Sequence, residues 1–206
     1  MLNALAVGAG FAFPFKIGLC RSMRSSGTAL AFRPASHCIH TTMTLSDFTN
    51  ARLVVPHLRA TDAPGVIQEL GQALQRENRV PDFLPFYHAA LNREFLMGSN
   101  WEAGMAFPHA RSPGLKAVAF ALGRADVPIA WGASAGSAVR LVFLIAVPAT
   151  DSTQYLPLIS GLARLAKRTR LVEMLYAAAD AAQIIEVMKQ VALRTQFPPK
   201  PIRSGR

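Results

Sequence analysis

Apolar residues follow one another in two kinds of pattern after Met43, and the first kind predicts strands. The near-continuous apolar run 140–147, ended by Pro148, is typical of a central strand covered on both of its faces. Shorter extended stretches predict strands at 53–58, 104–107 and 117–122.

The second kind of pattern, apolar residues at helical spacing, separates these stretches. Segment 62–64 predicts a helix start with Pro64 in the first turn, and an apolar stripe at a spacing of four follows it. Further helices are predicted from Asp82 to about Leu96, from Asp151 or Ser152 to about Lys167, and over 170–178 and 180–192. Strands and helices mixed in this order predict a three-layer α/β sandwich, a mixed β-sheet flanked by helices.

Composition divides the chain into three parts. We expect residues 1–42 to be a disordered or non-native N-terminal extension, with Met43 as the natural initiator. Residues 43–196 would form the folded domain, and residues 197–206 a flexible basic tail. Mass spectrometry of the native protein tests this expectation, because a mature chain starting well upstream of Met43 would contradict it.

Charge is concentrated outside the predicted domain. The chain carries a net charge of +10, but residues 1–42 hold four basic residues and no acid, and residues 197–206 hold three more basic residues. That leaves 15 basic and 12 acidic residues in the predicted domain. A nucleic-acid-binding face needs dense, clustered positive charge, so we expect no nucleic-acid partner.

The N-terminal part also holds both cysteines, Cys20 and Cys38, so the domain has neither a disulfide framework nor a Cys-rich zinc site. The grouping 37–40 has His and Cys donors but no matching second pair, and we expect no metal. The apolar start, 1–15, is too short to span a bilayer, and no positive residue precedes it. The acid-free stretch that follows superficially resembles an organelle transit peptide. We expect a cytoplasmic protein without a membrane span.

The segment 104–111 joins a predicted strand end to a proline and a histidine. Pro108 has no N–H and pushes Phe107 toward extended geometry. We therefore expect His109 just beyond the strand, where the ladder stops and side chains become accessible. A neutral imidazole there can act as a nucleophile. The other four histidines have ordinary explanations, in the tail or as structural residues: His37, His40, His57 and His88.

The same segment resembles a known family. Gly-x-Ala-Phe-Pro-His-Ala at 104–110, with Asn92-Arg93-Glu94 and Gly98-Ser99 upstream, is similar to the active-site segment of fructose, mannitol and nitrogen-type IIA domains of the bacterial sugar phosphotransferase system. The resemblance implies that His109 carries a phosphoryl group and that Arg93 contacts it. It also implies an HPr-type phosphocarrier protein as donor, a IIB domain or a regulated protein as partner, and no cofactor.

Each supporting residue also has a simpler interpretation. Arg93 and Glu94 are equally consistent with a charged pair on a solvated helix end. Arg111 would add positive potential beside His109 or point into solvent. Trp101 would form an apolar rim for a docking protein or cover the sheet edge.

One position departs from the family pattern. The family usually carries a second histidine at the start of the helix after the long apolar strand, and here that position is occupied by Tyr155. Its spacing from Ile159 and Leu162 directs it inward. A phenol donates one hydrogen bond but carries no positive charge near neutral pH, so the phosphoryl group would be less neutralised. Tyr155 would otherwise be a plain core aromatic.

The resemblance leaves two functions open. The main interpretation is a IIA component that accepts a phosphoryl group from phospho-HPr on His109 and passes it to a IIB domain for sugar uptake. The alternative is a nitrogen-type IIA regulatory protein whose phosphorylation state controls its binding to partner proteins. A degenerate domain without phosphorylation is the third possibility.

Overall fold

The computed structural model describes residues 42–101, 104–132, 138–150 and 153–193, in which five helices enclose a six-stranded sheet. The helices are α1 Ala63–Arg76, α2 Phe83–Leu96, α3 Tyr155–Ala166, α4 Thr169–Ala177 and α5 Ala181–Lys189. The strands are β1 Val54–Val55, β2 Asn100–Trp101, β3 Met105–Ala106, β4 His109–Ser112, β5 Ala119–Ala130 and β6 Ala138–Pro148. Short 3₁₀ turns occupy Leu45–Phe48 and Ala51–Leu53.

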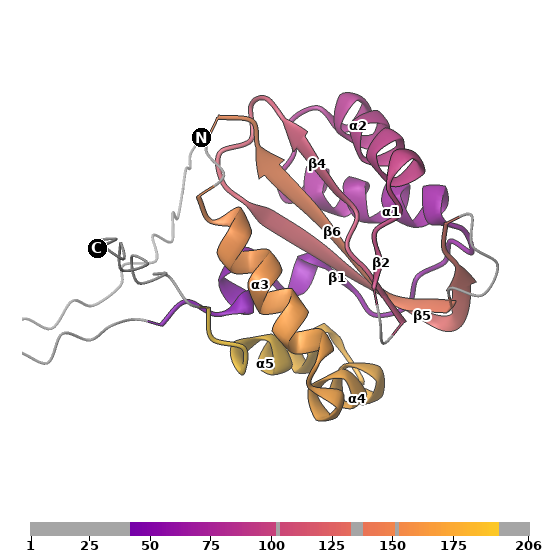
Figure 1. Ribbon diagram of the computed structural model, residues 1–206, viewed down its shortest axis with the longest axis vertical. Coiled ribbons are helices and arrows are strands. Elements are labelled where there is room, and N and C mark those ends of the chain that lie inside the picture. Colours follow the sequence, from indigo (N-terminus) through magenta and orange to yellow (C-terminus); the bar gives the residue numbers. More distant parts are fainter. Residues whose placement is uncertain (1–41, 102–103, 133–137, 151–152, 194–206) are drawn as a thin grey trace, which may run out of the picture. The chain divides into compact units, whose positions relative to one another are not determined.

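The sheet lies between two layers of helices, which confirms the predicted sandwich (Figure 1). Helices α1 and α2 cover one face, and α3, α4 and α5 cover the other. Two apolar clusters correspond to these faces, one containing Ile67 and Phe86 and the other containing Phe143 and Leu162. Central strand β6 contributes to both, with Val142 on the first side and Phe143 on the second. This two-sided burial explains its continuous apolar sequence.

The sheet is mixed in direction. Its strand order is β1-β5-β6-β3-β2, with β4 also pairing β6. β5 and β6 form the long antiparallel centre, β1 runs parallel to β5, and both β3 and β4 run parallel to β6.

The prediction that the ladder stops before His109 is wrong. β3 pairs Ala106 with Val142, and β4 pairs His109 with Ile145, so both segments keep one register along β6. Only Phe107 and Pro108 interrupt the strand, because Pro108 has no N–H to donate; its carbonyl still accepts the N–H of Ile145 at 2.9 Å. His109 therefore begins a second edge segment.

Other boundaries differ from the prediction for local reasons. The expected strand 53–58 shortens to β1, since Leu53 closes a 3₁₀ turn and Pro56 follows. β5 begins at Ala119 and extends past the expected end to Ala130, with an irregular register between Arg124 and Ile129. Helix α3 begins at Tyr155, and the expected start at 151–152 lies outside the described residues.

Capping explains where α1 begins. The Asp62 carboxylate accepts the N–H of Gly65 at 2.8 Å, and Pro64 lies in the first turn. α2 runs from Phe83 to Leu96, as predicted. Its C-terminal end reaches the edge of the sheet at β4, where His109 lies.

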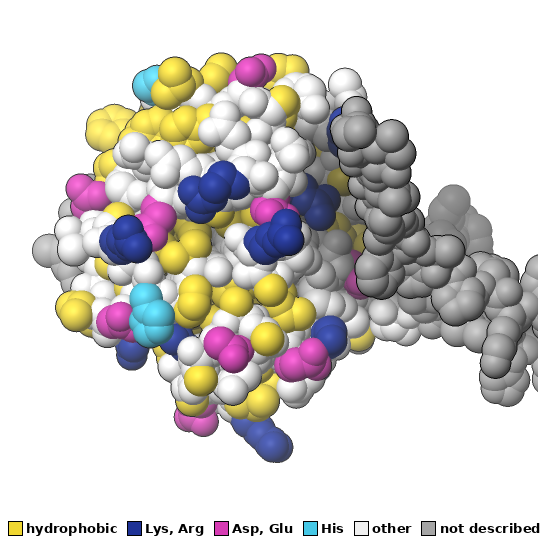
Figure 2. Space-filling view, turned by 180° about the vertical axis from the view of Figure 1, so that it is seen from behind, with side chains coloured by type: hydrophobic (Ala, Val, Ile, Leu, Met, Phe, Trp, Pro, Cys, Tyr) yellow, Lys and Arg dark blue, Asp and Glu magenta, His cyan; other side chains and the backbone are white. Residues whose placement is uncertain are grey.

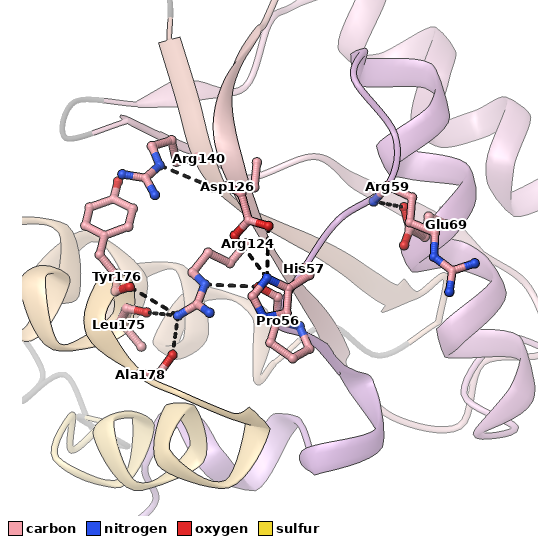
Figure 3. Close-up of polar contacts among 11 residues, drawn as sticks. Pro56, His57, Arg59, Glu69, Arg124, Asp126, Arg140, Leu175, Tyr176 and Ala178 are labelled. Atoms are coloured by element: carbon pink, nitrogen blue, oxygen red, sulfur yellow. Dashed lines mark hydrogen bonds and ion pairs between the residues drawn. The ribbon is translucent and has the colours of Figure 1, made fainter.

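A buried arginine links the sheet to the α4 side. Arg124 on β5 is only 5% exposed. Its guanidinium donates to the carbonyls of Leu175, Tyr176 and Ala178 at the end of α4, and its Nε donates to Pro56 at 3.0 Å (Figure 3). Carbonyls near a helix C-terminus carry partial negative charge, so they compensate the buried cation.

The first and last described segments are hydrogen-bonded to each other. The N–H of Leu45 donates to Val191 at 3.1 Å, the N–H of Leu193 donates to Met43, and Thr44 forms an antiparallel bridge with Ala192. The first and last described segments of the folded unit therefore lie side by side.

On the face seen in Figure 2, positive and negative side chains are interspersed with apolar ones, without a continuous field of one sign. Within the ranges given above, no helix is both long and apolar enough to cross a bilayer.

Candidate functional site

His109 lies at the edge of the sheet with its ring held by the preceding turn. Its Nδ1 atom is 3.1 Å from the carbonyl oxygen of Phe107. A carbonyl only accepts hydrogen bonds, so Nδ1 carries the proton and Nε2 carries the lone pair. The ring is half-buried and presents its nucleophilic nitrogen away from the backbone.

Arg93, in the last turn of α2, points at that nitrogen. Its Nε donates to His109 Nε2 at 3.1 Å, and its Nη1 lies 3.1 Å from the Met97 sulfur. The side chain is therefore held beside the imidazole, and the simpler interpretation of a solvated charged pair does not describe it.

The surroundings keep the imidazole neutral. Burial lowers the pKa of His109 below its usual 6.5, the Phe107 carbonyl opposes this, and the Arg93 cation lowers the pKa further. A neutral ring at pH 7 keeps its lone pair available for attack on an electrophile.

Tyr155, the first residue of α3, lies beside the imidazole. The two ring centroids are 5.6 Å apart, at an interplanar angle of 41°. The Tyr155 side chain packs on the same core cluster as Ile159, which fits the inward direction expected from the spacing. Burial raises the pKa of the Tyr155 hydroxyl, so the phenol stays protonated and able to donate.

These side chains share a cleft of about 440 Å³. It is lined by Ala89, Arg93, His109, Ala110, Arg111, Val147 and Tyr155. Arg111 is exposed, yet its positive charge lowers the pKa of both His109 and Tyr155, so it contributes to the potential in the cleft. The structure thus brings together all four residues singled out from the sequence.

Three further residues contribute to this geometry, and one of them carries no signal in the sequence. The Glu94 carboxylate is buried and accepts from the backbone and hydroxyl of Ser99 and from the indole N–H of Trp131. Glu94 and Ser99 belong to the quoted motif, but Trp131 lies 37 residues beyond Glu94. No periodicity predicts that contact.

Trp101 and two further arginines lie outside this cleft. Trp101 is 45% exposed and lies on the edge strand β2, with its ring 6.0 Å from that of Phe107. Arg164, in the last turn of α3, donates to the carbonyl of Ala192, and Arg168, just after that helix, donates to the carbonyl of Gln190. Both carbonyls lie beyond the C-terminus of α5. This placement is favourable for cations near helix ends.

A larger cleft, of about 710 Å³, lies between α1, the end of α2 and the segment after β5. Its lining is mainly apolar, including Ile67, Leu91 and Phe95, and contains no histidine. The imidazole of His109 lines the smaller cleft instead.

Across the described ranges, no three His, Cys, Asp or Glu side chains cluster in a way that could hold a metal ion. The grouping at 37–40 lies outside those ranges. The cleft instead combines a neutral nucleophile with two cations and a phenol. This arrangement can accept an anionic electrophile and stabilise it by hydrogen bonds and charge.

Comparison with known proteins gives a family for this fold and motif. The family model described as "Phosphoenolpyruvate-dependent sugar phosphotransferase system, EIIA 2" matches residues 47–191. A nitrogen regulatory protein of Bradyrhizobium diazoefficiens is 27% identical over 146 residues, which cover 71% of this chain and 95% of that protein. The fructose-specific EIIABC component of Bacillus subtilis is 24% identical over 148 residues, which cover 72% of this chain but only 23% of that protein.

Solved structures agree on the fold. The nitrogen regulatory protein IIA-Ntr of Neisseria meningitidis matches with a TM-score of 0.61 at 22% identity, over 70% of this chain and 98% of that one. The mannitol IIA enzyme of Escherichia coli, solved in complex with its phosphorylated IIB enzyme, matches with a TM-score of 0.58 at 17% identity, over 68% and 95%.

Proposed function

Since the chain belongs to the EIIA type 2 family of the phosphoenolpyruvate-dependent sugar phosphotransferase system, a family of phosphoryl-transfer domains, we propose that His109 is the residue on which it carries a phosphoryl group. The main support for this proposal is the hydrogen bond from Nδ1 to the Phe107 carbonyl, because it places the proton on Nδ1 and leaves Nε2 unprotonated. Phospho-HPr, a phosphohistidine protein, is the proposed donor.

In phosphoryl transfer the protein mainly positions the two reactants and stabilises the negative charge of the phosphoryl group. The Nε2 lone pair attacks the phosphorus, the N–P bond of the donor breaks, and the donor ring leaves with the electron pair of that bond. The proton of His109 stays on Nδ1 during this step, where it is donated to the Phe107 carbonyl.

Arg93 changes partner in the same step. Its Nε now donates to Nε2, the atom that forms the new bond. When the phosphoryl group arrives, the guanidinium moves to the phosphoryl oxygens, for which its five N–H donors are suited. Arg111 adds positive potential, and the Tyr155 hydroxyl donates one hydrogen bond where the family's usual second histidine would supply a charge.

Of the two roles open to such a phosphocarrier, we favour regulation through binding of partner proteins. Two findings support it. The nitrogen regulatory relative aligns over nearly its whole length, whereas the chain spans about a quarter of the fructose component. Tyr155 also suits a domain in which rapid onward transfer matters less than the phosphorylated state itself.

Onward transfer to a IIB domain for sugar uptake is the second candidate. It is supported by the similarity to the fructose component and by the mannitol complex, in which a IIA domain is bound to its IIB partner.

Two assays test the proposal in sequence. The purified protein is incubated with labelled phosphoenolpyruvate, the general phosphotransferase enzyme and HPr, and we expect acid-labile label that is absent from His109→Ala. Label retained by that variant would refute the assignment. The labelled protein is then mixed with fructose-type and mannitol-type IIB domains. Retention of the label supports regulation, and rapid discharge to either domain supports transport.

A further inference from the structure

A buried carboxylate lies one residue beyond Arg93 and does not touch His109. Glu94 is 7% exposed, and both of its oxygens are occupied. Oε1 accepts the backbone N–H of Ser99 at 2.7 Å and the Trp131 indole N–H at 2.8 Å, and Oε2 accepts the Ser99 hydroxyl. Three donors on one buried carboxylate hold it in a single position.

This carboxylate is connected to the imidazole by a continuous series of hydrogen bonds. Glu94 fixes Ser99, and the carbonyl of Ser99 accepts the N–H of Phe107 at 3.0 Å. The carbonyl of Phe107 then accepts the His109 Nδ1 proton at 3.1 Å. Phe107 lies in the interruption between β3 and β4, where β6 offers it no ladder partner, so Ser99 supplies its lateral support.

The same carboxylate also holds the other side of the site. Glu94 belongs to the last turn of α2, and its bond to Trp131 attaches that turn to the segment after β5. Arg93 lies in the same turn and donates to His109 Nε2. Displacement of Glu94 would therefore shift both hydrogen-bond partners of the imidazole.

We propose that Glu94, held by Trp131 and Ser99, is a positioning residue that sets the tautomer of His109 and the approach of Arg93. The inference rests on His109 as the phosphoryl acceptor, but the tautomer itself is a property of the unphosphorylated protein. It can be measured without any donor, so the two proposals can fail separately.

The experiment is ¹⁵N NMR of the histidine rings in the full chain at about pH 8, where the imidazole is neutral. Wild type is expected to show Nδ1 protonated and Nε2 unprotonated. In Glu94→Ala we expect a substantial population protonated at Nε2. Glu94→Gln retains an oxygen for the two N–H donors and should recover most of the wild-type spectrum.

The matched control is Glu69→Ala. The Glu69 carboxylate also accepts backbone N–H groups, those of Arg59 and Ala60, but on α1, away from the cleft (Figure 3 draws Arg59 and Glu69). A variant that only loses local structure should leave the His109 spectrum unchanged. Circular dichroism and a dispersed amide spectrum establish that each variant is folded.

Phosphorylation rate is the second readout. One lost hydrogen bond on the carboxylate corresponds to about a fivefold change in an equilibrium, so Trp131→Phe and Ser99→Ala should each accept phosphoryl groups about fivefold more slowly. If Glu94→Ala does not fold, these two milder variants decide the matter. An unchanged tautomer and rate in folded variants would overturn the positioning role. An altered tautomer in Glu94→Ala, together with a wild type that is never phosphorylated, would overturn only the acceptor assignment.

Discussion

The Nε2 atom of His109 has one lone pair, and in the unphosphorylated protein Arg93 occupies it. The 3.1 Å hydrogen bond both orients the ring and covers the atom that we propose as the nucleophile. In the reaction that we propose, the phosphoryl group enters as the guanidinium leaves that position. The cation remains close enough to meet the charge that arrives.

Substitution of Arg93 tests two effects of its cation, one on the phosphorylation rate and one on the pKa of His109. In Arg93→Met, we expect phosphorylation about 100-fold slower, the usual loss for one donor at a developing charge. The pKa of His109 should rise, because the Arg93 cation is one of the influences that lowers it. Rate measurement and an NMR titration check the two effects; a lower pKa in the variant would contradict this explanation.

The pH dependence follows from the direction of the His109 pKa. Burial, followed by the Arg93 and Arg111 cations, holds that pKa below 6.5, against the opposing Phe107 carbonyl and Glu94 carboxylate. The nucleophile therefore stays neutral as the pH falls to the ordinary histidine range, and is lost only below it. We expect a phosphorylation rate that is flat from about pH 8 to about pH 6.5 and that falls at lower pH. A decline that begins above pH 7 would show a raised pKa instead.

Tyr155 gives the most direct test of the departure from the family pattern. A charged donor is worth more than a neutral one by about 1 kcal/mol, or roughly fivefold. Tyr155→His should therefore raise the phosphorylation rate about fivefold near pH 6, where part of the imidazole is charged, and Tyr155→Phe should lower it. Equal rates in all three proteins would show that this position only fills the core.

At the scale of elements, one interrupted strand and one helix end build the site. β3 and β4 share a register along β6, and the break at Phe107 and Pro108 frees a carbonyl for the imidazole. α2 ends beside β4 and supplies Arg93. The His109 ring is thus attached through β4 to the central strand β6.

The contact between β5 and the end of α4 should contribute strongly to stability. Arg124→Met would remove the donor that several buried carbonyls share, including those of Leu175 and Ala178. Unsatisfied buried acceptors make this substitution cost about 2–4 kcal/mol in the free energy of unfolding. Urea denaturation measures it, with Arg76→Met on the exposed end of α1 as control, expected within about 0.5 kcal/mol of wild type.

The sequence predicts those elements that have a long hydrophobic pattern or whose ends are marked by a particular residue type. β6 is recognisable as an apolar run, and α2 is bounded as predicted between Asp82 and Leu96. β2 and β4 have two and four residues, too few to show a period, and depend on partners elsewhere in the sheet.

The residues of the site likewise fall into those that the sequence predicts and those that it does not. His109 and Arg93 lie in the short segments that carry the family resemblance, so both are predicted from the sequence, and the structure places them in contact. The Glu94–Trp131 bond joins residues that only the folded sheet brings together, and neither residue type by itself indicates a pair. The tautomer depends on one carbonyl orientation, which no spacing encodes.

At the scale of the whole molecule, the two apolar clusters are built by described residues between Leu45 and Leu193. We propose that residues 43–196 form an independent domain. A chain restricted to these residues should unfold within about 3 °C of the full chain and be phosphorylated at the same rate. Calorimetry and the labelling assay test this, and a large fall in the unfolding temperature would show that residues outside the range contribute to the fold.

The bridge between Thr44 and Ala192 has a consequence for protein engineering. A domain whose chain enters and leaves at adjacent points can be spliced into a surface loop of an unrelated host with short linkers and little distortion of either partner. The same adjacency permits circular permutation, with the native ends joined and new ends opened in an exposed turn.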